Sequence, residues 1–240
     1  VLTIGFARRV PTYKRLTLML HDPERLRALL LHPERPVQLV IAGKSHPADD
    51  EGKRLIQKLV EFASGADVRH RIVFLPNYDI AMAQVLYPGT DVWLNNPLRP
   101  LEASGTSGMK SSLNGGLNLS ILDGWWDEWY DGENGWAIPT ADGVEDADRR
   151  DELEAAALYD LIENQVAARF YDRNDDDVPT RWVASIRHTL STLSQPLSAD
   201  RMVQEYVNRL YIPAARSERV ISASSYDPAR ELAQWKRRVT

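Results

Sequence analysis

The stretch Val37-Gln38-Leu39-Val40-Ile41-Ala42-Gly43-Lys44 decides the fold. It is a short apolar run rich in β-branched residues that ends at a glycine, and such runs are typical of strands buried on both faces of a parallel sheet. Similar short apolar runs recur on both sides of it, and helical patterns lie between them. This alternation predicts an α/β fold, with a Rossmann-like parallel sheet flanked by helices.

The apolar periodicity places the expected elements along the chain. Strands are predicted over residues 1–7, 37–42, 72–75, 91–94 and 117–122. Helices are predicted over 12–31 (broken near Asp22-Pro23), 52–63, 80–86 and 108–114. From about residue 147 the pattern becomes helical, with further helices over 182–193, 200–210 (Asp200 as a candidate N-cap) and 232–235. We therefore expect a Rossmann-like domain over residues 1–145 and a helical extension over 146–240 that packs on it.

Composition excludes several classes of protein. The 240 residues are 43% hydrophobic and 26% charged, which is typical of a globular chain. The net charge of -5 gives no electrostatic reason to expect nucleic acid. There is no cysteine, so we expect neither disulfides nor thiolate chemistry. There is also no apolar run long enough for a membrane and no signal-peptide pattern, so we expect no membrane partner and a cytoplasmic location. The chain begins with Val1 rather than Met, which suggests a piece of a longer protein.

The segment Glu102-Ala103-Ser104-Gly105-Thr106-Ser107-Gly108-Met109-Lys110 has the residue types of a phosphate cradle. Small residues let backbone N–H groups approach an anion closely, and hydroxyls add donors. A lysine beside such a cradle can bind an aldehyde cofactor covalently, which suggests pyridoxal phosphate on Lys110. The same residues also suit a plain connection into a helix that ends in a solvated lysine.

Several polar segments follow directly after predicted strands. Ligands of open parallel sheets bind beyond the carboxyl ends of the strands, so these segments should converge on one rim. They are Arg8-Arg9, Gly43-Lys44, Tyr78 and residues 102–110. The guanidinium of Arg9 suits an oxyanion and Lys14 adds a point charge, although a solvated helix start has the same composition.

Three motifs carry a resemblance to a known family. Residues 102–110 resemble the pyridoxal phosphate attachment segment of the α-glucan (glycogen, starch, maltodextrin) phosphorylases, and Leu113-Asn114-Gly115-Gly116-Leu117 and Asp123-Gly124 continue the match. Arg8-Arg9-Val10-Pro11-Thr12-Tyr13-Lys14-Arg15 is similar to the basic segment with which that family holds phosphate. Gly43-Lys44-Ser45-His46-Pro47 is similar to its turn after a buried strand. The resemblance covers residues 1–145 well and the rest less sharply.

The resemblance implies a role for each matching residue. It implies that Lys110 anchors the cofactor, that Arg9 and Lys14 hold the substrate phosphate, and that the remaining positions bind cofactor (Arg8, Tyr78, Thr106, Ser107, Gly108) or glucosyl hydroxyls (Glu102, Ser104, Gly105). Three positions depart from the better-known members. Arg8 replaces a common lysine, Ser107 a glycine and Asp79 an arginine, so the geometry around both phosphates differs from theirs.

The resemblance also implies an activity. The chain would be the C-terminal, cofactor-bearing half of a glycosyltransferase B architecture that catalyses reversible phosphorolysis of terminal α-1,4-linked glucose to glucose 1-phosphate with retention. Its partners would be an α-glucan, inorganic phosphate and a missing N-terminal domain. Members of the family are commonly dimeric, so the resemblance also allows a homodimer. The cofactor phosphate would exchange a proton with the substrate phosphate, and no metal would be needed. Alone, these residues should have little activity.

Two other classes of function stay open. One is a nucleotide-sugar glycosyltransferase, or glycogen synthase-like half domain, without pyridoxal phosphate. The other is a noncatalytic glucan-binding module, in which the segment Trp125-Trp126-Asp127-Glu128-Trp129-Tyr130 would stack on sugar rings. For that segment a packed corner against the sheet is the commoner outcome. The acidic turn at 172–177 lacks an ordered ligand spacing and should be solvated rather than metal-binding.

Overall fold

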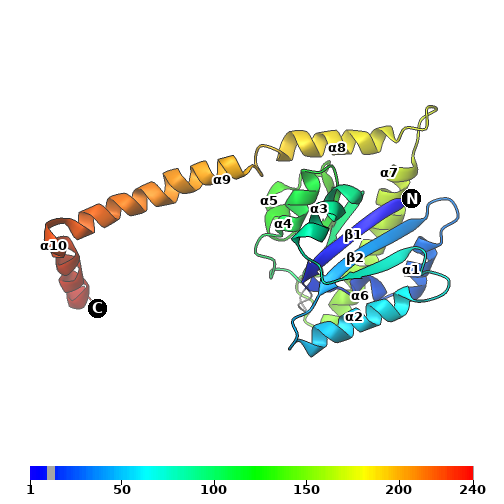
Figure 1. Ribbon diagram of the computed structural model, residues 1–240, viewed down its shortest axis with the longest axis horizontal. Coiled ribbons are helices and arrows are strands. Elements are labelled where there is room, and N and C mark those ends of the chain that lie inside the picture. Colours follow the sequence, from blue (N-terminus) through cyan, green and yellow to red (C-terminus); the bar gives the residue numbers. More distant parts are fainter. Residues whose placement is uncertain (10–13, 240) are drawn as a thin grey trace. The chain divides into compact units, whose positions relative to one another are not determined.

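The computed structural model describes residues 1–9 and 14–239. The chain divides into two compact units, Val1–Leu193 and Ser194–Thr240. The first unit contains the sheet and the helices that cover it, and the second is helical (Figure 1). The predicted domain boundary near residue 145 remains a prediction.

The first unit is built on a six-stranded parallel sheet. Its strands are β1 (Leu2–Arg9), β2 (Val37–Lys44), β3 (Ile72–Pro76), β4 (Val92–Asn95), β5 (Leu117–Ile121) and β6 (Gly135–Ile138). Their order is β3-β2-β1-β4-β5-β6, and every neighbouring pair is parallel. The predicted α/β class with a Rossmann-like sheet is confirmed, whereas β6 was not expected. Strand order reverses between β1 and β4, which is where ligands bind in doubly wound sheets.

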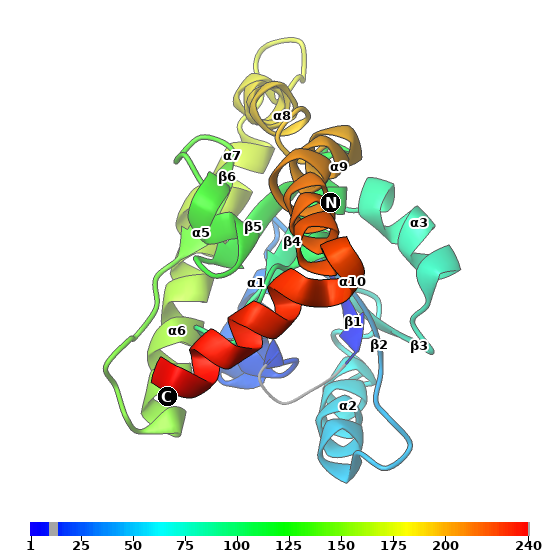
Figure 2. The same cartoon turned by 90° about the vertical axis from the view of Figure 1, so that its left-hand side faces the viewer.

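Helices cover both faces of this sheet. One face carries α1 (Pro23–Leu30), α2 (Asp50–Ala63) and α6 (Ala147–Leu161), and the other carries α3 (Ile80–Gly89), α4 (Thr106–Ser112) and α5 (Trp125–Trp129) (Figures 1 and 2). Side chains of β1 alternate between the two faces. Leu2, Ile4 and Phe6 join the larger core cluster, while Ala7 joins the smaller one with α3. Both faces of the sheet are therefore buried, which explains why the residues along each strand are almost all apolar.

The sequence after β1 is not the helix that its spacing predicts. Residues 10–13 of the predicted helix lie outside the described residues. After Lys14, Arg15 has a φ of 49°, a left-handed conformation that an α-helix does not accommodate. A short 3-10 helix, η2 (Leu18–Leu20), follows. The expected break near Asp22-Pro23 is the start of α1, because the Asp22 side chain accepts from the backbone of Arg25 and Pro23 takes the first helical position.

The chain after α6 is helical. A π-helical turn, η3 (Ile162–Val166), joins α6 to α7 (Ala167–Tyr171), and α8 is Thr180–Leu193. The second unit contains α9 (Ala199–Tyr206), η4 (Val207–Tyr211) and α10 (Ile212–Val239), which has non-helical backbone at 223–226. Ser198 caps α9 by accepting from the N–H of Asp200, so the prediction of Asp200 as the N-cap is wrong.

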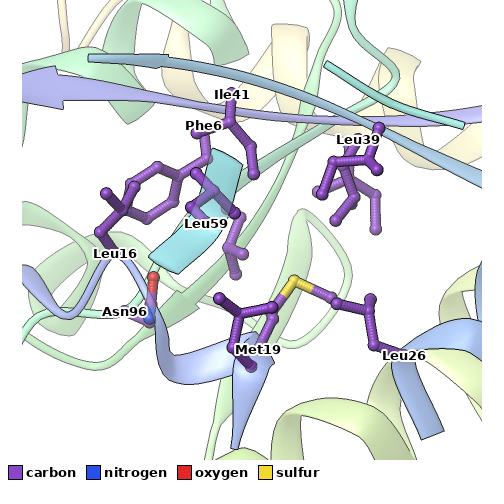
Figure 3. Close-up of a pocket in the computed structure, with 12 residues that line it drawn as sticks. Phe6, Leu16, Met19, Leu26, Leu39, Ile41, Leu59 and Asn96 are labelled. Atoms are coloured by element: carbon purple, nitrogen blue, oxygen red, sulfur yellow. The ribbon is translucent and has the colours of Figure 1, made fainter. Parts of the chain in front are cut away.

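A small cavity lies in the larger core, between β1, β2, α2 and η2. Its volume is about 20 Å³, and apart from Asn96 its lining is apolar (Figure 3). The Oδ1 atom of Asn96 is buried without a hydrogen-bond partner among the described residues. A buried water needs two or more polar partners, so this lining favours a dry cavity.

Candidate functional site

Arg8 joins three strands at the point where strand order reverses. It is the penultimate residue of β1 and only 8% exposed. Its Nη2 donates to Oδ1 of Asn95, the last residue of β4, and Nδ2 of Asn95 donates to Ser120 Oγ of β5 at 3.1 Å. Arg8 and Gly43 are paired in register. The carboxyl ends of these strands therefore form one rim, as the sequence predicts.

Glu102 lies between two cations at this rim. Its Oε2 forms an ion pair with Lys14 Nζ and lies 3.9 Å from Arg8 Nη1. The backbone N–H of Glu102 donates to Oδ2 of Asp123 at 2.9 Å, which ties the segment to the end of β5. Glu102 is 8% exposed, and a carboxylate buried to this extent is stable only with such partners. The structure thus gathers Arg8, Lys14 and Glu102 into one cluster.

The small-residue segment turns sharply into α4. Gly105 is the N-cap residue with a φ of 83°, which favours glycine, and the carbonyl of Ser104 accepts from Trp125 N–H at 2.9 Å. Gly108 is packed closely: a Cβ there would lie 2.5 Å from Asn118 Oδ1. Only small residues allow the start of α4 to pack this closely against Asn118 and Trp125.

Thr106 and Lys110 lie on one face of α4. They are four residues apart, so their side chains are neighbours one helical turn apart, and both are exposed. Ser107 faces the sheet, where its Oγ accepts from Trp93 Nε1 at 3.1 Å. An amine and a hydroxyl are thus presented together, while Ser107 holds the helix to β4.

One aromatic ring, that of Tyr87, lies beside the lysine. Lys110 Nζ lies 6.0 Å from the centroid of the Tyr87 ring, and the Tyr87 hydroxyl is 3.0 Å from that of Tyr78. Tyr87 also packs against Trp93, with ring centroids 4.7 Å apart. Burial, together with the hydrogen bond to Tyr78, raises the pKa of the Tyr87 hydroxyl, so it stays neutral. Lys110, Tyr87 and Gln84 line one surface hollow beside α3.

The remaining predicted positions occupy nearby places. Arg9 is the exposed last residue of β1, in register with Lys44. Asp79, which departs from the family's arginine, caps α3 by accepting from Met82 N–H at 2.9 Å. Trp125 and Trp126 are buried, and Trp126 Nε1 donates to the backbone of the β6 strand. The packed-corner interpretation is therefore confirmed for these two residues.

Several residues of the site were missed by sequence reasoning. Asn95 follows a buried strand directly, and the strand-end rule that singled out Arg8 would have found it. Tyr87 lies one residue beyond the helix predicted over 80–86, and no motif singles it out. Arg15 and Glu154 contact each other across 139 positions of the chain, and no local pattern indicates this.

The described residues also bear on two other classes of site. Among residues 1–9 and 14–239, no group of His, Asp or Glu side chains is arranged to hold a metal ion. Within the same residues, none of the helices combines the length and apolar character that crossing a membrane requires.

Comparison with known proteins identifies the family of this chain. The family model described as carbohydrate phosphorylase matches residues 6–129, which include the clusters around Glu102 and Lys110. The chain belongs to the carbohydrate phosphorylase family. Glycogen phosphorylase of Mycobacterium tuberculosis (strain CDC 1551 / Oshkosh) is 67% identical over 238 residues, which cover 99% of this chain and 28% of the relative.

Two further carbohydrate phosphorylases are also similar. Maltodextrin phosphorylase of Thermococcus litoralis is 42% identical over 99% of this chain and 28% of its own length. Glycogen phosphorylase of Aquifex aeolicus is 45% identical over 91% of this chain and 31% of its own length. The chain therefore spans less than a third of the length of these curated relatives.

Proposed function

We propose that this chain is the cofactor-bearing portion of an α-glucan phosphorylase, which cleaves terminal α-1,4-linked glucose with inorganic phosphate to give glucose 1-phosphate with retained configuration. The observation that carries the proposal is the arrangement of α4, the helix that follows β4, with Lys110 and Thr106 one turn apart on its exposed face. A glucan phosphorylase needs two anion sites side by side, one for cofactor and one for substrate.

The residues present fit pyridoxal phosphate. Lys110 offers an exposed amine, and Thr106 offers a hydroxyl on the same face of α4 one turn away, where the Cβ atoms of such a pair are about 5–6 Å apart. Arg8 adds a buried positive charge, and Gly108 lets α4 pack closely against Asn118 and Trp125. When bound, pyridoxal phosphate supplies its phosphate group as the proton-exchange partner of the substrate phosphate. Lys110 tethers it, and Thr106, Ser107, Gly108, Arg8 and Tyr78 orient it.

The cluster around Glu102 suits the two substrates. Lys14 and the exposed guanidinium of Arg9 hold inorganic phosphate, because cations with several donors suit a tetrahedral oxyanion. The Glu102 carboxylate accepts hydrogen bonds from glucosyl hydroxyls, and Ser104 and Gly105 line the same turn. In the free protein Lys14 and Glu102 neutralise one another, and on binding each exchanges its partner for a substrate group. The positive rim then stabilises phosphate beside the developing oxocarbenium character.

The remaining length of the relatives carries the rest of the proposed site. The matched region is 28% of the Mycobacterium tuberculosis relative, which supports the proposal that sequence outside this chain contributes the other side of the glucan site. We expect the isolated 240 residues to release little or no glucose 1-phosphate from glycogen.

The test is made on the purified full-length protein that contains this chain. Its absorption spectrum should show a bound aldehyde cofactor, and borohydride reduction followed by peptide mass mapping should place the label on Lys110. Lys110→Ala should lose the label and glucose 1-phosphate release, whereas Lys53→Ala, on the exposed surface of α2, should keep both. Wild-type protein without covalent cofactor, or a label retained by Lys110→Ala, would refute the proposal.

A further inference from the structure

We infer that Arg15 and Glu154 are positioning residues, a buried ion pair through which α6 fixes the spacing between Lys14 and Glu102. The inference rests on the proposed function, because it concerns how the substrate groups are held. Arg15 is the last residue of the basic segment that resembles the family's phosphate-holding segment, but the resemblance implies no role for its side chain, and Glu154 lies outside all three motifs.

Arg15 connects the segment after β1 to the loop after β4. Its Nε donates to the carbonyl of Asn96 at 3.0 Å, and its Nη2 donates to the carbonyl of Pro97 at 2.9 Å. In return, Asn96 Nδ2 donates to the carbonyl of Arg15 at 3.0 Å. Lys14 and the loop that leads to Glu102 are therefore locked together at the first residues of that loop.

Glu154 holds the other side of the Arg15 guanidinium. It has no exposed surface, and its Oε2 lies 2.6 Å from Arg15 Nη2. Its Oε1 accepts from Arg150 Nε at 2.9 Å and from the N–H of Ala141 at 3.0 Å. Asp151, one turn earlier on α6, adds a contact of 2.9 Å to Arg15 Nη1. The α6 helix thus forms a rigid base for the guanidinium.

The same helix reaches further along the loop. Arg150 Nη2 donates to the carbonyl of Arg99 at 3.3 Å, three residues before Glu102. The loop from β4 to Glu102 is consequently held at Asn96, Pro97 and Arg99 by two arginines that share one carboxylate. A shift of Glu154 would move both arginines, and with them both Lys14 and Glu102.

The backbone of Arg15 shows that this arrangement is maintained at a cost. Its φ of 49° is unfavourable for a residue with a Cβ, and such strain persists only where the surroundings over-determine it. A buried ion pair is also weak evidence for stability, since apolar residues of similar volume often replace one without loss. A role in fixing the geometry of neighbouring groups accounts for both features.

A second arginine–glutamate pair on the same helical stretch provides a matched control. Arg25 of α1 contacts Glu163 through Nη2 at 2.6 Å and Nε at 2.8 Å. This pair also ties a neighbouring element to the α6–η3 segment. Its side chains are 30% and 32% exposed, so it is less buried than Arg15–Glu154. It contacts neither the loop after β4 nor Lys14 in any described interaction, so it has the residue types of Arg15–Glu154 without their connection to the rim.

The experiment measures substrate constants and phosphate binding in the full-length holoprotein. Arg15→Lys keeps the charge but loses the fork that spans two carbonyls, and Glu154→Gln keeps the size but loses the charge. We expect each to raise KM for phosphate and for glycogen, and Kd for inorganic phosphate by calorimetry, roughly ten- to a hundredfold. The double variant should fall short of the product of the single effects, because both act through one pair. Arg25→Lys and Glu163→Gln should leave these constants unchanged.

Each outcome decides the claim. A purely structural role would lower the folded fraction and the apparent kcat while KM and phosphate Kd stay at wild-type values, and that result would overturn the inference. Multiplicative effects in the double variant would also overturn it. Wild-type protein that releases no glucose 1-phosphate would refute the proposed function separately, and the phosphate Kd of Arg15→Lys against that of Arg25→Lys would still decide the positioning role.

Discussion

Gly108→Ala is the substitution that most directly tests the close packing of α4. The added methyl carbon would lie 2.5 Å from Asn118 Oδ1 and 3.1 Å from the Trp125 ring. Overpacking of this kind costs about 1–3 kcal/mol. Asn118 would also give up its donations to Gly108 O and Ser112 Oγ, about 1 kcal/mol each. The better helix propensity of alanine returns about 1 kcal/mol.

These terms give a net loss of about 2–4 kcal/mol in the free energy of unfolding. For a domain of this size that corresponds to a fall in Tm of roughly 5–15 °C, measured by calorimetry. The matched control is Gly89→Ala, at the end of α3, where a Cβ would meet nothing within 4 Å. It should be neutral or slightly stabilising.

The same substitution has a functional readout. A displaced α4 carries Thr106 and Lys110 with it, so cofactor content per folded molecule should fall in Gly108→Ala and not in Gly89→Ala. Adding Asn118→Ala removes the nearest clash and should restore part of the lost stability. Equal melting temperatures and equal cofactor content for the two glycine variants would show that the packing argument is wrong.

Two further changes test other parts of the first unit. Tyr159→Phe removes a buried hydroxyl that donates to the carbonyls of Met19 and Asp22. In a denaturant titration it should lower the free energy of unfolding by about 1–3 kcal/mol. An unchanged unfolding midpoint would contradict this expectation. Burial opposes ionisation of Asp131, but hydrogen bonds from backbone N–H groups and from His188 outweigh it and lower the pKa of this carboxyl below 3.8. The ionised form of Asp131 therefore stabilises the fold above that pH. This stabilisation is lost as the pH falls through the pKa of the folded state. Asp131→Asn should therefore cost no more than about 1 kcal/mol at pH 7, and its melting curve should meet that of the wild type in strong acid; a difference independent of pH would refute the linkage.

The sheet could be predicted largely because its strands are buried on both faces. Runs such as residues 37–42 need no context to identify, and the carboxyl-edge rule then brings Arg8 and Glu102 together. β6 was missed because Gly135-Trp136-Ala137-Ile138 is short and lacks a β-branched run. Its pairing with β5 is what makes it a strand.

The failures have a common physical origin in non-local contacts. The spacing of Leu16, Met19 and Leu20 suggests a helix, but the left-handed backbone of Arg15 and its contacts with the loop after β4 hold the chain in a turn. Glu154 lies within an ordinary helical pattern, and only the fold shows that it faces two arginines. Local patterns identify the groups that touch ligands more readily than those that hold them in place.

The position of β1 in the sheet has a consequence for biosynthesis. β1 pairs with β2 on one side, but on the other side it pairs with β4, and the Thr3–Asp91 contact at that boundary spans 88 residues. A nascent chain that has docked β2 onto β1 still presents an unpaired apolar edge until β4 leaves the ribosome. Such an edge invites association with other unfinished chains. Translation speed between β2 and β4, and the holdase chaperones that meet this stretch, should therefore influence the yield of folded protein.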